Sequence, residues 1–266
     1  MSGSGNDFVV FDARKSSAEA VERPEVIQRL CERGTGIGAD GVVFVARAER
    51  PGASLAMRYY NSDGSRGAFC GNATLCVARL AAELGIAHKG TMTIEIDRVV
   101  VPARMGPGGP EMDLPAVSEV STSVDVLDLA AGESRMGFAL AGVPHVVVRC
   151  ADVESAPVVA RGRELRNSSF RSEGANVNFV SGRTGAWKIR TYERGVEDET
   201  LACGSGAIAS AILLAHWGES GDETAFTTRS GRVLTVRLKR EGEHWMPTLA
   251  GEGRIVFTGE LSELPN

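Results

Sequence analysis

The chain has 266 residues, of which 43% are hydrophobic, 24% charged and 6% aromatic, and its formal net charge is −5. This composition is that of a folded globular protein and excludes disordered, collagen-like and coiled-coil classes. No block of Lys and Arg indicates nucleic-acid or membrane-surface binding. The longest apolar run, around 207–215, is far shorter than the roughly 20 residues that a membrane span needs.

The cysteine count and the N-terminal residues both favour the cytosol. Five cysteines are an odd number in a chain too long to depend on disulfides, which indicates reduced thiols. The polar start Met1-Ser-Gly-Ser-Gly-Asn-Asp7 lacks the basic and apolar regions of a signal peptide. We therefore expect a cytoplasmic protein that binds neither nucleic acid nor a membrane.

The segment Gly36-Ile-Gly-Ala-Asp-Gly41 matches the dinucleotide-binding pattern G-x-G-x-x-G. That pattern binds a pyrophosphate where it follows a strand and opens a helix. Here a helical pattern at 25–31 precedes the motif and an apolar strand pattern at 42–46 follows it. We interpret the motif as a tight turn from a helix to a strand.

Two segments predict helices that begin at a cysteine. An Ala- and Leu-rich stretch runs from Cys70 to Gly85, and a similar one runs from Cys203 to Gly218, where glycine suits the end of a helix. A strand pattern that ends in a polar loop precedes each cysteine, and another strand pattern follows each helix. These strand segments are 56–64, 91–101, 187–195 and 225–236. The chain therefore contains an internal repeat with a period of half its length.

The repeat predicts an α/β (α+β) fold of two pseudo-symmetric halves. Both helices are apolar nearly all round, which is typical of helices buried on every side. We therefore expect each half to be a β-sheet or barrel wrapped around a central helix. The Gly- and Pro-rich stretch Met105–Met112 is expected to connect the halves, and 253–261 is expected to return to the first half as a last strand. The expected domains are 1–110 together with the C-terminal strand 253–266, and 111–252.

Cys70 and Cys203 are candidate catalytic residues. A thiol at the first turn of a helix faces unpaired backbone N–H groups and the positive end of the helix dipole, and both favour the thiolate. The small residues that follow each cysteine let a carboxylate approach the same N–H groups. Two such sites related by a repeat predict a racemase or epimerase without a cofactor. One thiolate would remove a proton from a carbon, and the opposite thiol would return one to the other face. The alternative is that both are ordinary buried cysteines.

Seven motifs together resemble the diaminopimelate epimerase family of the lysine and peptidoglycan pathways. They are Gly5-Asn6-Asp7-Phe8, Gly36-Ile-Gly-Ala-Asp-Gly41, Asn61-Ser-Asp-Gly-Ser65, Cys70-Gly-Asn72, Pro144-His145, Asn176-Val-Asn-Phe179, and Glu193-Arg194-Gly195 leading to Cys203-Gly-Ser-Gly206. The resemblance spans nearly the whole chain. It implies two-base epimerisation of LL- to meso-diaminopimelate by an isomerase with a pseudo-symmetric two-domain fold, commonly a homodimer. No metal and no organic cofactor are expected.

The resemblance also implies a role for each matching residue. Cys70 and Cys203 form the acid/base pair, and His145 and Glu193 lie beside the thiols and assist them. The residues implied to bind substrate are Asn6, Asn61, Asn176, Glu193 and Arg194. The residues implied to hold the reacting carboxylate are Gly71, Asn72, Gly204 and Ser205. Arg194 suits the carboxylate at the other end of diaminopimelate, since a guanidinium pairs with a carboxylate through two hydrogen bonds.

The chain departs from the family pattern in three respects. Many members have Gln at the position of Gly41 and Asn at the position of Val143, so two polar substrate contacts are expected to be absent. The loop from Glu193 to Cys203 is one residue longer than the commonest form. Family members also usually begin with a strand before the Gly-Asn-Asp-Phe motif.

Two other functions are compatible with the sequence. A racemase of the same superfamily, acting on another amino acid such as histidine or proline, is favoured by Gly41 and Val143 and opposed by Asn176 and the Glu193–Arg194 pair. The other is a non-catalytic ligand-binding protein of the same fold, since site residues drift among the phenazine-type relatives. The presence of both cysteines argues against it, because a binding protein needs neither. The remaining cysteines are expected to be core residues, since no Cys/His spacing indicates zinc. They are Cys31, Cys76 and Cys150.

Overall fold

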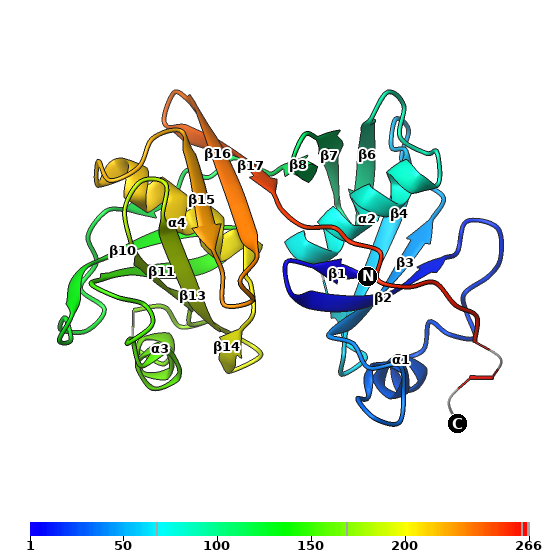
Figure 1. Ribbon diagram of the computed structural model, residues 1–266, viewed down its shortest axis with the longest axis horizontal. Coiled ribbons are helices and arrows are strands. Elements are labelled where there is room, and N and C mark those ends of the chain that lie inside the picture. The colour runs from blue at the N-terminus through cyan, green and yellow to red at the C-terminus, as the bar shows by residue number, and fades with distance from the viewer. Residues whose placement is uncertain (68, 169, 262, 265–266) are drawn as a thin grey trace. The chain divides into compact units, whose positions relative to one another are not determined.

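The computed structural model describes residues 1–67, 69–168, 170–261 and 263–264. The chain forms two compact units (Figure 1). Unit 1 consists of Met1–Met112 and Ala250–Asn266, and unit 2 consists of Asp113–Leu249.

Unit 1 is a mixed sheet with two helices. Its elements are β1 (Ser2–Gly3), β2 (Asn6–Asp12), α1 (Pro24–Cys31), β3 (Gly41–Ala46), β4 (Leu55–Asn61), β5 (Arg66–Gly67), α2 (Gly71–Glu83), β6 (Thr91–Ile96), β7 (Val99–Gly106) and β8 (Gly109–Asp113). Strand β2 is parallel to β3, and β3 is antiparallel to β4. Strand β4 is parallel to β6, and β6 is antiparallel to β7.

Unit 2 has the same design. Its elements are β9 (Val120–Ser121), β10 (Glu133–Ala141), β11 (Val143–Cys150), α3 (Val158–Arg166), β12 (Asn176–Ser181), β13 (Trp187–Glu193), β14 (Asp198–Thr200), α4 (Gly204–His216), β15 (Glu223–Thr227), β16 (Val233–Glu241) and β17 (His244–Ala250). Strand β11 is parallel to β12, and β12 is antiparallel to β13. Strand β13 is parallel to β15, and β15 is antiparallel to β16.

Strand register identifies equivalent residues in the two units. Leu55 pairs with Ile94 in unit 1, and Trp187 pairs with Phe226 at the same place in unit 2. A short hairpin strand, β5 or β14, and then a helix of 13 residues follow β4 and β13. Cys70 immediately precedes α2, and Cys203 immediately precedes α4. The two cysteines are therefore structurally equivalent, and the fold class predicted from the repeat is confirmed.

The two 13-residue helices lie at the centre of their units. Helix α4 contacts β10, β11, β12, β15 and β16, whereas α2 contacts β1, β4, β6 and β7 (Figure 1). All residues of Gly206–Leu214 are buried, which explains the nearly unbroken apolar sequence of α4. Both helices are followed by a glycine with positive φ, Gly85 and Gly218, where a side chain would strain the backbone.

Strands β3 and β12 are buried along their whole length. Helix α1 packs on β3, and β12 contacts both α3 and α4. A strand covered in this way needs apolar side chains on both faces, which accounts for the continuous run 42–46. The order α1 then β3 also confirms that Gly36–Gly41 is a turn from a helix to a strand.

The expected linker at Met105–Met112 is wrong. Residues 105–106 end β7 and residues 109–112 belong to β8, and these two strands form an antiparallel hairpin in which Gly106 is opposite Gly109. The Gly- and Pro-rich composition reflects the tight two-residue turn of this hairpin.

Segment 253–261 returns to unit 1 as expected, but the expected last strand is wrong. Arg254 makes a single antiparallel bridge to Ser2, and the described residues after it are irregular. Strand β1 has only two residues, so the segment has no longer strand beside it with which to pair. Val256 and Phe257 are consequently exposed.

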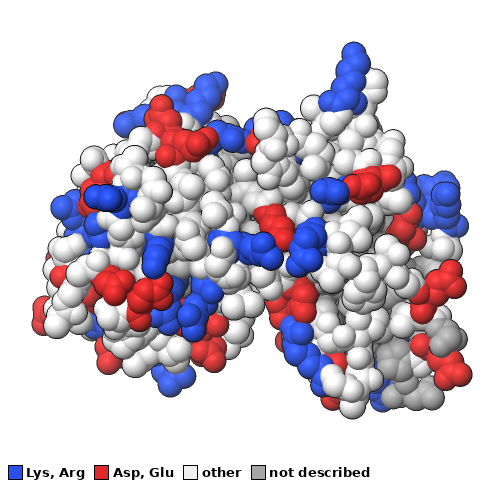
Figure 2. Space-filling model, in the orientation of Figure 1, with Lys and Arg blue, Asp and Glu red and all other residues white. Residues whose placement is uncertain are grey.

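The described residues include no helix with the length and hydropathy of a membrane span. Figure 2 shows basic and acidic side chains interspersed over the face that it draws, without a continuous basic patch.

We expect Ile212→Ala to lower the free energy of unfolding by about 2–5 kcal/mol, because Ile212 is fully buried in α4 and its truncation leaves a cavity. Urea denaturation measures this change. Arg79→Ala on the exposed side of α2 is the control, expected to shift the free energy by about 0.5 kcal/mol or less. A loss below about 1 kcal/mol for Ile212→Ala would contradict the central position of α4.

Candidate active site

Cys70 lies at the N-terminus of α2 with an extended backbone. Its carbonyl oxygen accepts hydrogen bonds from the N–H (3.0 Å) and the hydroxyl (2.8 Å) of Thr74. The hydrogen bond from the N–H is the first backbone hydrogen bond of the helix. The Cys70 side chain is partly exposed and does not cap the helix. The thiol and the first-turn N–H groups therefore lie at the same end of a buried helix.

Cys203 has the same place in α4. Its carbonyl oxygen accepts from the N–H of Ala207 (3.0 Å), and its Sγ is 3.6 Å from the hydroxyl of Ser205. The other cysteines are buried, as expected for core residues, and burial raises their pKa: to about 11 for Cys31 and Cys150, and to about 12 for Cys76. Cys70 and Cys203 differ from them in being partly exposed at a helix N-terminus.

A chain of hydrogen bonds holds Asn6 and Asn72 in unit 1. Asn72 Nδ2 donates to Asn6 Oδ1 (2.7 Å), and Asn6 Nδ2 donates to Asp40 Oδ2 (3.0 Å). Arg33 donates to both carboxylates, Asp7 (2.7 and 2.9 Å) and Asp40 (2.9 Å). Burial alone would raise the pKa of Asp7, but the Arg33 guanidinium lowers it. This ionised network, absent from the sequence-based site, fixes Asn6 and through it the first turn of α2.

Asn61, at the end of β4, is held by two neighbours. Its Oδ1 accepts from the Tyr59 hydroxyl (2.9 Å), and its Nδ2 donates to the Ser65 hydroxyl (3.0 Å). The Tyr59 ring lies against two glycines, Gly41 and Gly67, and a Cβ on either would overlap it. Position 41 therefore has no room for a side chain, and the Tyr59 hydroxyl supplies a polar contact to Asn61. Val143, which stands where many members of the family that the sequence resembles have Asn, is the first residue of β11 and pairs with Ala141 of β10.

Asn176 and Arg194 are joined in unit 2. Asn176 is buried, and its Oδ1 accepts from the backbone N–H of Arg194 (2.8 Å). Arg194 Nη1 donates to the carbonyl oxygens of Glu173 (3.2 Å) and Gly174 (3.4 Å). Glu193 is half-buried, and this burial raises the pKa of its carboxyl.

His145 is fully buried on β11, beside Asn176 of β12. Burial and, to a lesser extent, the positive charge of Arg194 lower the pKa of His145 to about 3. The imidazole is therefore neutral near pH 7. Its Nδ1 lies 3.1 Å from Nδ2 of Asn178, a residue that the sequence-based site omits.

The long loop between Glu193 and Cys203 is partly ordered as β14. Asp198 pairs with Glu193 across a turn of four residues, in which Glu197 has a positive φ of 58°. The Glu197 carboxylate accepts from the N–H of Gly195 (3.1 Å) and the hydroxyl of Tyr192 (3.2 Å). The loop therefore folds back on β13 as a hairpin.

The structure gathers the predicted residues into one group in each unit. In unit 1, Asn6 binds Asn72, which follows Cys70 and Gly71, and Asn61 is opposite Gly41. In unit 2, His145 is beside Asn176, and Asn178, two residues further along β12, reaches the first turn of α4. The unit 2 group consists of His145, Asn176, Glu193, Arg194, Cys203, Gly204 and Ser205.

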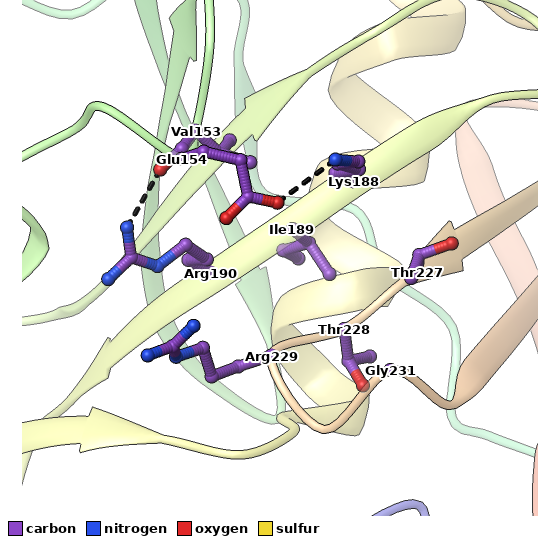
Figure 3. A pocket seen from close by; sticks show the side chains of 9 residues that line it. All are labelled: Val153, Glu154, Lys188, Ile189, Arg190, Thr227, Thr228, Arg229 and Gly231. Atoms are coloured by element: carbon purple, nitrogen blue, oxygen red, sulfur yellow. Dashed lines mark hydrogen bonds and ion pairs between the residues drawn. The ribbon is translucent and has the colours of Figure 1, made fainter.

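A separate pocket of about 180 Å³ lies in unit 2 (Figure 3). Its lining is formed by Val153, Glu154, Lys188, Ile189, Arg190, Thr227, Thr228, Arg229 and Gly231, none of which belongs to the predicted site. Lys188 pairs with Glu154 (3.0 Å) and Arg190 pairs with Glu199 (2.6 Å), so its charges are largely neutralised. Across the described residues, no cluster of three or more His, Cys, Asp or Glu side chains is arranged to hold a metal.

Comparison with known proteins places the chain in a family. The sequence model of the family described as diaminopimelate epimerase matches residues 1–103 and 138–256. A diaminopimelate epimerase of Gemmatimonas aurantiaca is 42% identical over 99% of this chain and 98% of its own length, and one of Aquifex aeolicus is 36% identical over 99% and 96%. The chain belongs to the diaminopimelate epimerase family. It is thus an epimerase, and the enzyme class expected from the paired cysteines, an isomerase, is confirmed.

Solved structures extend the likeness to the fold. A phenazine biosynthesis protein of the PhzF family from Bacillus anthracis is similar to this epimerase with a TM-score of 0.64 and 16% identity, covering 94% of this chain and 91% of that one. A probable proline racemase from Agrobacterium radiobacter gives a TM-score of 0.63 and 17% identity, covering 93% and 87%. At these identities the likeness concerns the fold alone.

We expect Glu193→Gln to stabilise this epimerase increasingly as pH rises from the ordinary glutamate pKa through the raised pKa of Glu193. Because burial raises the pKa of Glu193 in the folded state, the folded protein binds this proton more tightly than the unfolded chain does. Stability is therefore lost as pH rises from the ordinary glutamate pKa through the raised value, and glutamine removes that loss. Urea denaturation of the wild type and the variant across this pH range measures the difference in their free energies of unfolding, which should grow as pH rises. A difference that stays constant would contradict the raised pKa.

We expect Gly41→Ala to destabilise the protein by roughly 1–3 kcal/mol, the usual cost of overpacking. The added Cβ would lie 2.5 Å from the Tyr60 carbonyl oxygen and 2.7 Å from a ring carbon of Tyr59. Gly108→Ala is the matched control, since nothing lies within 4 Å of a Cβ there. Equal denaturation midpoints for the two variants would contradict the crowding at position 41.

Proposed function

We propose that the protein interconverts LL- and meso-diaminopimelate by a two-base mechanism, with Cys70 and Cys203 as the acid/base pair. The observation that carries the proposal is the structural equivalence of the two cysteines. Each precedes a central helix of 13 residues in its unit, in a chain of the diaminopimelate epimerase family. A reaction that inverts one carbon needs proton transfer on both faces, and two equivalent thiols supply it.

In the proposed mechanism, one cysteine thiolate removes the α-proton and the other thiol protonates the opposite face. The electron pair released from the C–H bond spreads onto the adjacent carboxylate. The N–H groups of Gly71 and Asn72 and those of Gly204 and Ser205 stabilise this charge, since the N-terminus of a helix favours anions. Proton removal and return leave the thiol pair with the same total number of protons. Preorganised N–H groups thus take the role that a metal or an organic cofactor would otherwise have.

The other end of diaminopimelate requires partners of its own. Arg194 is proposed to bind its carboxylate, because two carbonyl contacts through Nη1 leave the rest of the guanidinium fork for a ligand. Glu193 and Asn176 are proposed to bind the ammonium group. A cation at Glu193 would offset the burial that raises the pKa of this carboxyl. Asn6 and Asn61 are proposed to contact substrate from unit 1.

We also propose that the enzyme works as a cytoplasmic homodimer in lysine biosynthesis. Its five cysteines are free thiols, which fits a reducing compartment. The family resemblance supports the dimer.

We expect Cys70→Ser and Cys203→Ser each to lower the conversion of LL- to meso-diaminopimelate by at least about 10²-fold, the range for loss of an acid/base group. A serine hydroxyl is too weak an acid to ionise near neutral pH. A coupled assay measures turnover, circular dichroism checks the fold, and Cys31→Ala in the core is the control. Near wild-type turnover by either serine variant would refute the two-base assignment.

A substrate panel in D2O separates the alternatives. Exchange of the α-proton of diaminopimelate, but not of histidine or proline, supports the proposal. Exchange confined to histidine or proline supports the racemase of another amino acid. Binding of diaminopimelate without any exchange supports a non-catalytic ligand-binding protein.

A further inference from the structure

Three buried polar side chains form a chain of hydrogen bonds in unit 2. His145 and Asn178 are fully buried, and Thr191 is 3% exposed. The Thr191 hydroxyl donates to Asn178 Oδ1 (2.9 Å), and Asn178 Nδ2 lies 3.1 Å from both the Val146 carbonyl oxygen and His145 Nδ1. These contacts connect three neighbouring strands, β11, β12 and β13.

The orientation of the Asn178 amide follows from its partners. The Val146 carbonyl oxygen can only accept, so the Asn178 atom that faces it must be the NH₂ group. The same NH₂ group faces His145 Nδ1, and its second hydrogen points to that nitrogen. His145 Nδ1 must therefore accept, which places the single proton of the neutral ring on Nε2.

His145 Nε2 is the end of this chain. Among the described residues, no protein atom is a hydrogen-bond partner of this buried nitrogen. A buried N–H without a partner costs free energy and calls for an explanation. A ligand or a reacting group that accepts a hydrogen bond at Nε2 would supply one.

The other unit shows that the fold does not require these polar residues. By strand register, unit 1 has Phe8, Val43 and Tyr59 at the positions of His145, Asn178 and Thr191. There the contact is an edge-on packing of the Phe8 and Tyr59 rings. The same backbone is thus built with largely apolar packing in unit 1 and with a polar chain in unit 2.

The chain of hydrogen bonds also reaches the helix of the proposed catalytic cysteine. A Cβ on Gly206 would overlap Asn178 Oδ1 and would lie 3.3 Å from Cys203 Cβ. The equivalent residue of α2 is Ala73, which is fully buried. Asn178 therefore packs against the first turn of α4, at a place where only glycine leaves room for it.

We propose that Asn178 and Thr191 are positioning residues that hold His145 as the neutral Nε2–H tautomer, so that His145 serves the site as a hydrogen-bond donor and not as a proton carrier. Its acceptor is an anion, either a cysteine thiolate or the substrate carboxylate. The part of this proposal that concerns the reaction rests on the proposed function, whereas the tautomer does not. The low pKa of His145 is consistent with a ring that stays neutral.

The wild-type tautomer is tested directly by long-range ¹H–¹⁵N correlation of the ¹⁵N-labelled protein. The expected His145 pattern is a protonated Nε2 and an unprotonated Nδ1. The chain has four histidines, and single substitutions of His88, His216 and His244 assign the His145 signals by elimination. A protonated Nδ1 in the wild type would overturn the proposal, whatever the enzyme's substrate proves to be.

Asn178→Asp tests the link to the reaction. A carboxylate can only accept, so His145 Nδ1 is expected to become protonated, and kcat is expected to fall by roughly 10²- to 10³-fold, as when a preorganised donor is lost. Thr191→Val removes the hydrogen bond to the Asn178 amide oxygen, so the amide is held less firmly and kcat should fall several-fold. The matched Thr191→Ser keeps the hydroxyl and should have nearly the wild-type kcat. Full activity of an Asn178→Asp enzyme with a protonated Nδ1 would overturn the donor role.

Two further measurements identify the acceptor. If the acceptor is a thiolate, Asn178→Asp shifts the pH dependence of iodoacetamide alkylation of Cys70 or Cys203 in the absence of substrate. If it is the substrate carboxylate, alkylation is unchanged and KM rises. Unchanged alkylation and unchanged KM would together refute an anionic acceptor at Nε2. If the wild-type protein has the expected tautomer but no activity toward diaminopimelate, only the proposed function is refuted.

Discussion

Two central helices, each with a partly exposed cysteine at its N-terminus, are the constraint on which the rest of the structure depends. A helix surrounded by strands buries its apolar side chains, yet its first N–H groups lack partners within the helix. In α2 and α4 the residue at this end is a partly exposed cysteine whose side chain does not cap the helix. The sheet thereby positions thiol and N–H groups together, and neither has to be held by a mobile loop.

The two units use one backbone for different chemistry. In unit 1, an ionised Asp7–Arg33–Asp40 network orients Asn6 and Asn72. In unit 2, a neutral chain of hydrogen bonds leads to His145. Pseudo-symmetric thiols are consequently in unequal surroundings. Such inequality suits a reaction in which one thiol must be charged while the other is neutral, since equal environments would leave the starting protonation state undetermined.

The sequence allowed the repeated elements to be predicted because their signals are local. The apolar helices after Cys70 and Cys203 are read from composition, and the turn at Gly36–Gly41 from the order of its neighbours. The contacts that orient the site were beyond such reasoning, since they join residues distant in sequence. Asn178 is partly an exception. It lies two residues after Asn176 in the strand, and because side chains two residues apart lie on the same face of a strand, the sequence alone predicts that the two asparagines share a face. At Met105–Met112 the sequence does not distinguish a hairpin turn from a linker, because Gly and Pro are common in both.

The packing of the Tyr59 ring against Gly41 changes the interpretation of one departure from the family pattern, the glycine at position 41. Taken alone, a glycine in place of a polar residue indicates a lost substrate contact and favours a different amino acid as substrate. In the structure, the Tyr59 ring fills that space between Gly41 and Gly67, and its hydroxyl binds Asn61. The glycine is therefore a steric requirement of the tyrosine, and the site keeps a polar group on Asn61. Gly41 is therefore no longer evidence for another substrate. At Val143 no described contact supplies a polar group in place of the missing one, so this residue still favours another substrate.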